Sequence, residues 1–242
     1  MHSSAQKTAN TIGIKYDLIS FDKGGNKPWN FVSMEYNRMI KKFPLTARVN
    51  YANRFGKSGL QLEGEAYPSI SKKIYTYINA GYSIDSLVFP KFRGGVSLYA
   101  SLPSAFEVDG GFRILYFNSA TWIYTAGVGK YYKNYWFNFS TFLTPANSSI
   151  LQSYFLKTRF YLNDKDFIML TMGTGISPDD RNNNIQLNTN TKLNSKKAEI
   201  SFRRTIKKIN VILINAGWMS QEYDTKKYTH QYNIGIGFQR SF

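Results

Sequence analysis

The 242-residue sequence contains no cysteine and only two histidines, His2 and His230. Without cysteine there can be no disulfide bonds, no thiolate metal sites and no cysteine nucleophile. Two imidazoles supply too few nitrogen ligands for a structural zinc site. We therefore expect neither a metal ion nor a cofactor.

Long hydrophobic runs are also missing. The mean hydropathy is −0.36 and no stretch approaches the ~20 apolar residues of a membrane-spanning helix. If the protein crosses a membrane, it must therefore cross as a closed β-barrel. The first residues, Met1 to Lys7, lack the apolar core of a signal peptide. We expect residues 1–9 to be a disordered or expression-derived N-terminus, with a signal peptide already removed.

Acidic residues are scarce: 15 Asp and Glu face 31 Lys and Arg, for a formal charge of +16. Nucleic-acid-binding proteins usually concentrate such charge in one patch or helix. Here the basic residues are scattered through turns and alternate strand positions, so we expect no nucleic-acid partner. Lipopolysaccharide phosphates or an anionic glycan are the predicted counterions.

Apolar residues alternate with small or polar residues along the sequence, most clearly at the C-terminus. Tyr232, Ile234, Ile236 and Phe238 share one face of a period-2 strand, and Phe242 ends the chain on the same face. Small or polar residues occupy the other face, as in the last strand of an outer-membrane β-barrel. A strand at the end of a soluble β-sandwich has the same alternation, and so remains an alternative.

About fourteen such segments recur along the chain, each near the ~10 residues that a tilted membrane strand needs. No Pro- or Ser-rich linker divides them. The pattern predicts an all-β fold: a transmembrane antiparallel up-and-down β-barrel of about 14 strands, with 12 as the alternative. We expect residues 10–242 to form this single domain.

The connections between segments alternate in length, as expected if both termini are periplasmic. The longer, outward set comprises residues 21–28, 84–91, 179–194 and 220–227, and the shorter, inward set comprises 41–43, 102–105, 132–134 and 207–208. Residues 179–184 are polar and predict a solvated outer loop. Aromatic side chains gather near the strand ends and predict interfacial girdles. They are Tyr67, Tyr75, Tyr82, Phe89, Trp122, Tyr131, Tyr132, Trp136, Tyr161, Trp218, Tyr223 and Tyr228.

Charged residues alternate with the apolar ones and predict a polar lumen. We expect these side chains to set selectivity or rigidity: Glu63, Glu65, Glu107, Asp109, Arg113, Lys157, Arg159 and Arg203. Carboxylates two residues apart on a strand lie at ~7 Å, a separation that glycosidases also use. A barrel interior uses the same arrangement to neutralise its lysines and arginines.

His230 is the one weak candidate for catalysis. It lies near Ser220 and Glu222 at the expected outer rim, where a Ser–His–Glu arrangement could serve a hydrolase acting on lipid or lipopolysaccharide. The alternative is an ordinary polar strand residue.

Several stretches resemble the YaiO family of outer-membrane barrel proteins. They are 63–68, 75–83, 89–94, 101–107, 111–117, 129–136, 159–161 and 173–179, within a resemblance that extends from residue 59 to the terminus. Their most specific parts are Phe-Pro-Lys-Phe-Arg-Gly, Gly-Lys-Tyr-Tyr and Gly-Ile-Ser-Pro-Asp. The resemblance implies an outer-membrane location and a barrel fold, but no activity or catalytic set. Phe242 resembles the signal recognised by the barrel-assembly machinery.

Together these patterns predict a non-enzymatic protein of the Gram-negative outer membrane. It would be a narrow conduit or an accessory envelope subunit that handles an anionic or glycan ligand, with an unidentified protein partner. A lipid-modifying or lipopolysaccharide-modifying hydrolase and a soluble glycan-binding β-sandwich are the alternatives.

Overall fold

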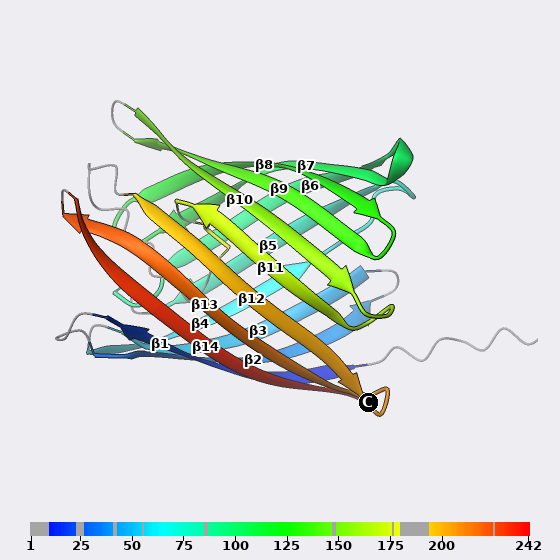
Figure 1. The fold of residues 1–242 in the computed structure, drawn as a ribbon, viewed down its shortest axis with the longest axis horizontal. Helices are drawn as coiled ribbons and strands as arrows, with labels where there is room; N and C mark the ends of the chain where they lie inside the picture. The colour runs from blue at the N-terminus through cyan, green and yellow to red at the C-terminus, as the bar shows by residue number, and fades with distance from the viewer. Residues whose placement is uncertain are drawn as a thin grey trace, which may run out of the picture.

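The chain folds into a closed β-barrel (Figure 1). The computed structural model describes residues 10–22, 27–40, 43–54, 56–84, 87–146, 149–175, 177–179, 194–224 and 226–242. Each of the fourteen strands pairs antiparallel with the next, and β14 pairs with β1. The predicted 14-strand barrel is thereby confirmed, and the 12-strand and β-sandwich alternatives are wrong.

The elements follow one another with one 3₁₀ turn, η1, between β6 and β7. The strands are β1 (Thr11–Phe21), β2 (Trp29–Ile40), β3 (Phe43–Arg54), β4 (Lys57–Ala66), β5 (Ile74–Ser83), β6 (Phe92–Leu102), β7 (Phe106–Tyr116), β8 (Ala120–Tyr132), β9 (Tyr135–Ala146), β10 (Ser149–Tyr161), β11 (Phe167–Thr174), β12 (Ser195–Ile206), β13 (Asn210–Asp224) and β14 (Lys227–Ser241), and η1 is Pro103–Ala105. Within the described part of the chain, no helix has the length and apolar character needed to cross a bilayer.

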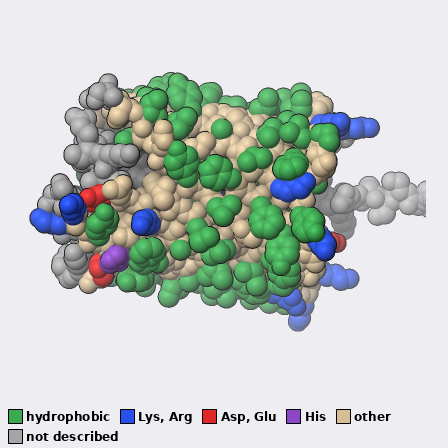
Figure 2. All heavy atoms as spheres, turned by 45° about the horizontal axis from the view of Figure 1, so that its top comes forward, with side chains coloured by type: hydrophobic (Ala, Val, Ile, Leu, Met, Phe, Trp, Pro, Cys, Tyr) green, Lys and Arg blue, Asp and Glu red, His purple; other side chains and the backbone are tan. Residues whose placement is uncertain are grey.

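Alternation along the strands separates an apolar outer wall from a polar interior. Ile234 and Ile236 on the outer wall are 67% and 59% exposed, whereas Asp17 and Gln61 on the inner face are fully buried. Large apolar side chains cover the face of the outer wall that Figure 2 shows. This is the distribution that a barrel needs when lipid surrounds it and water or polar groups fill its interior.

The barrel closes where the two ends of the chain meet. The backbone N–H of Asn10 donates to the Phe242 carbonyl at 3.0 Å, and the N–H of Phe242 donates to the Asn10 carbonyl at 2.8 Å. Beside this pair, the hydroxyls of Thr11 and Ser241 are 2.9 Å apart. Both termini of the barrel domain therefore lie at one end, which we call the terminal end, and the other is the distal end.

Connection lengths differ between the two ends only partly as predicted, because β3–β4, β7–β8 and β9–β10 at the distal end are short and β4–β5 at the terminal end is long. At the terminal end β2–β3, β8–β9 and β12–β13 are joined by short turns, and the long β11–β12 connection lies at the distal end. Short turns mark the periplasmic side of outer-membrane barrels. One predicted loop is wrong: 220–227 is a tight hairpin, because β13 and β14 stay paired through Gln221 opposite Thr229.

The predicted aromatic girdles are only partly correct. Tyr82, Trp122 and Tyr132 are indeed exposed on the outer wall. By contrast, Tyr75 lies two residues from buried Tyr77 and therefore points into the lumen. The same alternation places further predicted girdle residues on the inner face: Tyr131, Trp136 and Tyr161.

The lumen as the candidate functional site

A network of charged side chains covers the inner face from β2 to β6, centred on Arg48 of β3. Its guanidinium lies 3.1 Å from Glu35 of β2, 3.2 Å from Glu65 and 3.6 Å from Glu63, both of β4. Adjacent strands place these residues opposite one another, because Glu35 and Glu63 both face Arg48 in the register. One cation thus contacts three carboxylates and links three strands.

Glu63 is the most enclosed member of this network. Its side chain is fully buried, and it accepts hydrogen bonds from the amides of Asn50 at 3.1 Å and Asn79 at 2.6 Å. Arg93 of β6 lies 3.8 Å away. A buried carboxylate persists only when charges and hydrogen bonds replace its hydration, and here both are supplied.

The segment Ser177–Asp179, from the connection after β11, folds into the lumen. Arg113 of β7 donates to both oxygens of Asp179, at 2.8 and 3.4 Å, and Arg93 donates to the carbonyl of Pro178 at 3.0 Å. Pro178 is fully buried. Asp179 was expected in a solvated outer loop, and this expectation is wrong; residues 180–184 lie outside the described residues.

The electrostatics of Asp179 favour its charged form. Burial alone would raise the pKa of its carboxyl, but the Arg113 guanidinium, with Arg93 and Lys157 further away, holds the pKa below its ordinary value of 3.8. Arg113 is itself fixed by Ser97, whose hydroxyl accepts its Nη1 at 2.9 Å. The contact is therefore a charge-assisted anchor between the segment and the barrel wall.

Apolar side chains occupy the inner face toward the distal end. Phe31 and Ala52 pack against Val88 and Phe89, which come from the connection between β5 and β6. The guanidinium of Arg54 lies over the Phe89 ring at 5.4 Å. Gly59 makes this packing possible, because a Cβ at that position would be 2.6 Å from Cβ of Val88.

A second apolar cluster faces the first across the barrel. It consists of Leu115, Ile123, Phe142 and Phe155, from four consecutive strands, β7 to β10. The sequence patterning did not reveal these inward-facing apolar residues. The available signal was the run Ile114-Leu115-Tyr116-Phe117, where alternation between apolar and polar residues ceases.

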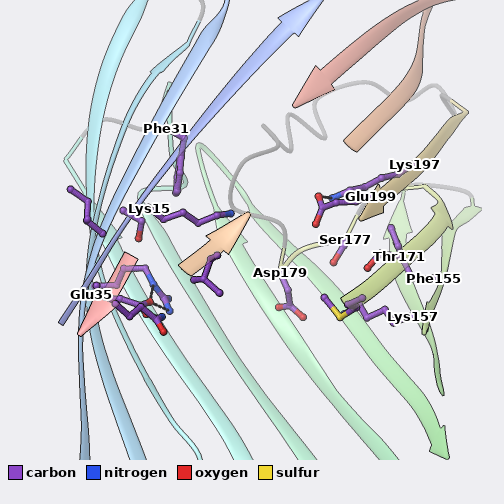
Figure 3. Close-up of a pocket in the computed structure, with 17 residues that line it drawn as sticks. Lys15, Phe31, Glu35, Phe155, Lys157, Thr171, Ser177, Asp179, Lys197 and Glu199 are labelled. Carbon is purple, nitrogen blue, oxygen red and sulfur yellow. Dashed lines mark hydrogen bonds and ion pairs between the residues drawn. The ribbon is translucent and has the colours of Figure 1, made fainter. Parts of the chain in front are cut away.

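A cavity of about 380 Å³ lies in the lumen beside the inward segment (Figure 3). Its lining comes from opposite walls, with Lys15 of β1 and Glu35 of β2 on one side and Lys157 of β10 on the other. Asp179 lies between the walls. Lys197 and Glu199 of β12 also line it and form an ion pair at 3.1 Å.

Most lumen charges are paired, which makes the exceptions informative. In the described part of the chain, Lys157 makes no hydrogen bond or ion pair, although it lines the cavity. Glu107 and Asp109 of β7 likewise have no ion pair there, and the contact of Glu107 is a hydrogen bond from the Tyr75 hydroxyl at 3.1 Å. These three side chains lack the ion pairs that hold most of the other lumen charges.

The remaining two predicted lumen cations have other neighbours. The Arg159 guanidinium lies over the rings of Phe167 at 4.3 Å and Trp136 at 4.9 Å. Arg203 donates to the backbone carbonyl of Lys165, in the turn after β10. The eight predicted lumen residues therefore lie on one inner surface, but they form separate groups rather than a single cluster.

His230 does not form the arrangement that a hydrolase needs. It lies opposite Ser220 on the outer face, where its ring stacks on Trp218 at 5.8 Å. Its Nδ1 has no hydrogen-bond partner among the described residues, whereas a catalytic carboxylate would accept from that atom. The Glu222 carboxylate instead accepts from the backbone and side chain of Asn194.

No group of three or more potential metal ligands occurs within the described ranges. A closed antiparallel barrel with an apolar outer wall and a charged interior is an outer-membrane β-barrel. The chain belongs to the YaiO membrane β-barrel domain family, whose model matches residues 9–180. The match begins before residue 59, where the resemblance was expected to start, and ends before β12, not at the C-terminus.

Solved structures with the same fold include outer-membrane proteins of low sequence identity. The Acinetobacter baumannii outer membrane protein Omp33 is 13% identical with a TM-score of 0.57, covering 98% of this chain and 100% of that one. A bacterial polysaccharide outer membrane secretin is 10% identical at 0.62, covering 97% and 99%. The CymD monoaromatic hydrocarbon channel is 8% identical at 0.62, covering 97% and 89%. No curated protein sequence matches the chain.

Proposed function

We propose that this barrel is a narrow conduit for small anionic solutes, including acidic sugars. The observation that carries the proposal is the charged lumen cavity, in which Lys157 has no ion pair among the described residues. An anion that enters the cavity can pair with the Lys157 ammonium without breaking an existing ion pair. Of the solved structures with this fold, one is named a monoaromatic hydrocarbon channel and another a bacterial polysaccharide outer membrane secretin.

The size of the barrel supports a narrow passage. A small barrel can fill most of its interior with side chains. Here the two apolar clusters and the segment Ser177–Asp179 occupy part of the inner face. The passage is therefore selective by charge and by size, unlike a wide diffusion pore.

We expect Lys157→Glu to reverse the charge preference. In planar bilayers with a salt gradient, the wild-type reversal potential should indicate anion preference, and the variant should indicate cation preference. The reason is that the substitution places an unpaired carboxylate at the cavity wall. Lys72→Glu, in an exposed turn at the terminal end, makes the same charge change away from the lumen and should leave the preference unchanged. An absence of conductance in wild-type protein would refute the conduit.

The pair Glu107 and Asp109 provides the opposite test. Neither carboxylate has an ion pair among the described residues, although Arg113 and Lys157 partly offset the charge of Asp109, so the two should repel anions that pass β7. Glu107→Gln with Asp109→Asn should increase the anion-to-cation permeability ratio several-fold, measured from the same reversal potentials. A decrease in that ratio would contradict the assignment.

We also propose that the protein is not an enzyme and that its partners act at its surfaces. Exposed lysines at the distal end, including Lys91 and Lys227, support binding to lipopolysaccharide phosphates. Phe242, exposed at the seam between β1 and β14, supports recognition by the barrel-assembly machinery. We propose an envelope protein partner as well.

A further inference from the structure

The terminal end of the barrel carries an excess of positive charge. Exposed basic side chains lie in its turns or at the strand ends beside them: Arg38, Lys72, Lys73, Lys133, Lys165, Arg204, Lys207, Lys208 and Arg240. Described acidic side chains there are exposed Asp164, buried Asp166 and the lumen-facing Glu65 and Glu107, and Arg204 pairs with Asp166 at 3.3 Å. Figure 2 shows blue side chains gathered at this end, beside the wall of apolar side chains.

These cations divide into two groups by direction. Lysines in the turns, such as Lys133 and Lys207, lie beyond the strand ends. Arg38 and Arg240 instead lie within β2 and β14, on the same outer face as Tyr36 and Phe238. These arginines therefore point laterally from the barrel wall, toward the surrounding lipid.

Arg38 and Arg240 flank the start of β1. Ile12 of β1 is opposite Tyr36 on one side and Arg240 on the other. Only β1 separates the two arginines. Because neighbouring strands lie about 4.8 Å apart, both side chains can reach one ligand. Neither makes a hydrogen bond or ion pair within the described part of the chain. Both guanidinium groups are available to an anion.

The lysines in two of the turns have a strained backbone conformation. Lys133, Lys207 and Lys208 have φ of 50°, 50° and 66°, in the left-handed region that favours glycine or asparagine. Glycine would relieve the strain but would remove the charge. Strained positions are a reason to look for function, and in the β8–β9 and β12–β13 turns they carry positive charge, whereas Ser104 and Ala105 in the β6–β7 turn have positive φ without it.

We propose that this basic rim binds the phosphate groups of anionic phospholipids in the leaflet at the terminal end. Phosphate matches the planar fork of an arginine side chain, and guanidinium groups near a barrel end extend to headgroup depth. A soluble acidic partner approaching along the barrel axis would contact the turn lysines but not the lateral Arg38 and Arg240. The lateral arginines therefore favour lipid over protein, and the inference is independent of transport.

The test is retention of lipid by the folded barrel. Protein refolded in vesicles of phosphatidylcholine mixed with phosphatidylglycerol is released into detergent, and bound lipids are identified by native mass spectrometry. We expect wild-type protein to retain phosphatidylglycerol over phosphatidylcholine. Arg38→Gln with Arg240→Gln should weaken that preference about 30-fold, from the contribution of each cation near an anionic surface. The matched control, Lys27→Gln with Lys57→Gln at the distal end, should keep it.

Three outcomes would overturn the proposal: no lipid preference in wild-type protein, an unchanged preference in the arginine variant, or an equal loss in the distal control. Inorganic phosphate added at constant ionic strength should not displace the lipid, and displacement would assign the site to free phosphate. Lys207→Gln with Lys208→Gln should have a smaller effect, and a larger one would place the lipid phosphates at the turn lysines and not at the lateral arginines. Heat-modifiable migration on gels verifies folding. If the arginine variant does not fold, loss of the wild-type preference at high salt provides the test.

Discussion

We expect Asp179→Ala to raise the single-channel conductance several-fold. The carboxylate accepts two hydrogen bonds from Arg113 and is the charged anchor of the inward segment Ser177–Asp179. Without that anchor, the segment loses its strongest contact with the β7 wall, and the lumen beside it widens. The measurement is conductance in planar bilayers, with the size of the largest permeant sugar as a second readout.

Acid should have the same effect on wild-type protein. Because the pKa of Asp179 is lowered in the folded state, its anchoring contribution is complete above the ordinary value of 3.8 and is lost as the pH falls through the lower folded-state pKa. The restriction that the Asp179 anchor places on conductance should therefore persist from neutral pH to about 4 and be lost only below that. The groups that face Asp179 are Arg113, Arg93, Lys157 and Asp109, and the arginines stay charged throughout.

The variant identifies the cause of any acid response. Asp179→Ala should be insensitive to pH in the range where wild-type conductance rises. Asp164→Ala, which removes an exposed carboxylate in a turn at the terminal end, should behave as wild type. An acid response that persists in Asp179→Ala, or a variant with unchanged conductance, would show that this contact does not restrict the lumen.

Arg48→Met should be the most destabilising single substitution in the lumen. It retains the bulk of the side chain but leaves Glu35, Glu63 and Glu65 without their shared cation. Removing one partner of a buried ion pair typically costs about 3–5 kcal/mol, because the remaining charge is left uncompensated. We expect the free energy of unfolding in lipid vesicles to fall by about that amount, measured by urea titration and the heat-modifiable gel shift.

Neutralising the carboxylates should rescue this variant. Arg48→Met combined with Glu35→Gln and Glu65→Gln removes the charges that lost their partner, while Glu63 keeps Asn50, Asn79 and Arg93. Most of the lost stability should return. If the combined variant is less stable than Arg48→Met alone, then packing around the guanidinium, rather than charge, accounts for the loss.

Alternation allowed the sequence to predict the barrel and its inner surface. Phe112 and Arg113 fall on opposite faces of β7 as expected, because a strand with lipid on one side and charge on the other tolerates no shift of register. The same rule could have corrected the aromatic girdle. Tyr161 is two residues from Arg159 and so shares the inner face already assigned to that arginine, and Trp136 is two residues from the polar Asn138, which is buried on the inner face.

Contacts made by connections could not be predicted in this way. Asp179 reaches Arg113 across 66 residues, and Val88 packs against Gly59 on another strand. A strand has a period that fixes where each side chain points, whereas an irregular connection has none. The Arg48 network is intermediate: its charges could be assigned to the lumen, but their pairing depends on the register between β2, β3 and β4.

The contact between Asn10 and Phe242 determines when the barrel can close during folding. This contact and its neighbours join residues more than two hundred positions apart, so almost the whole chain must be delivered before the ring can close. Contacts this distant in sequence make folding slow. Until β14 reaches β1, both strands present unpaired edges that could join a neighbouring chain. Truncation within β14 should therefore give aggregates of open sheets rather than a smaller barrel, and a chaperone that shields β1 should be needed throughout export.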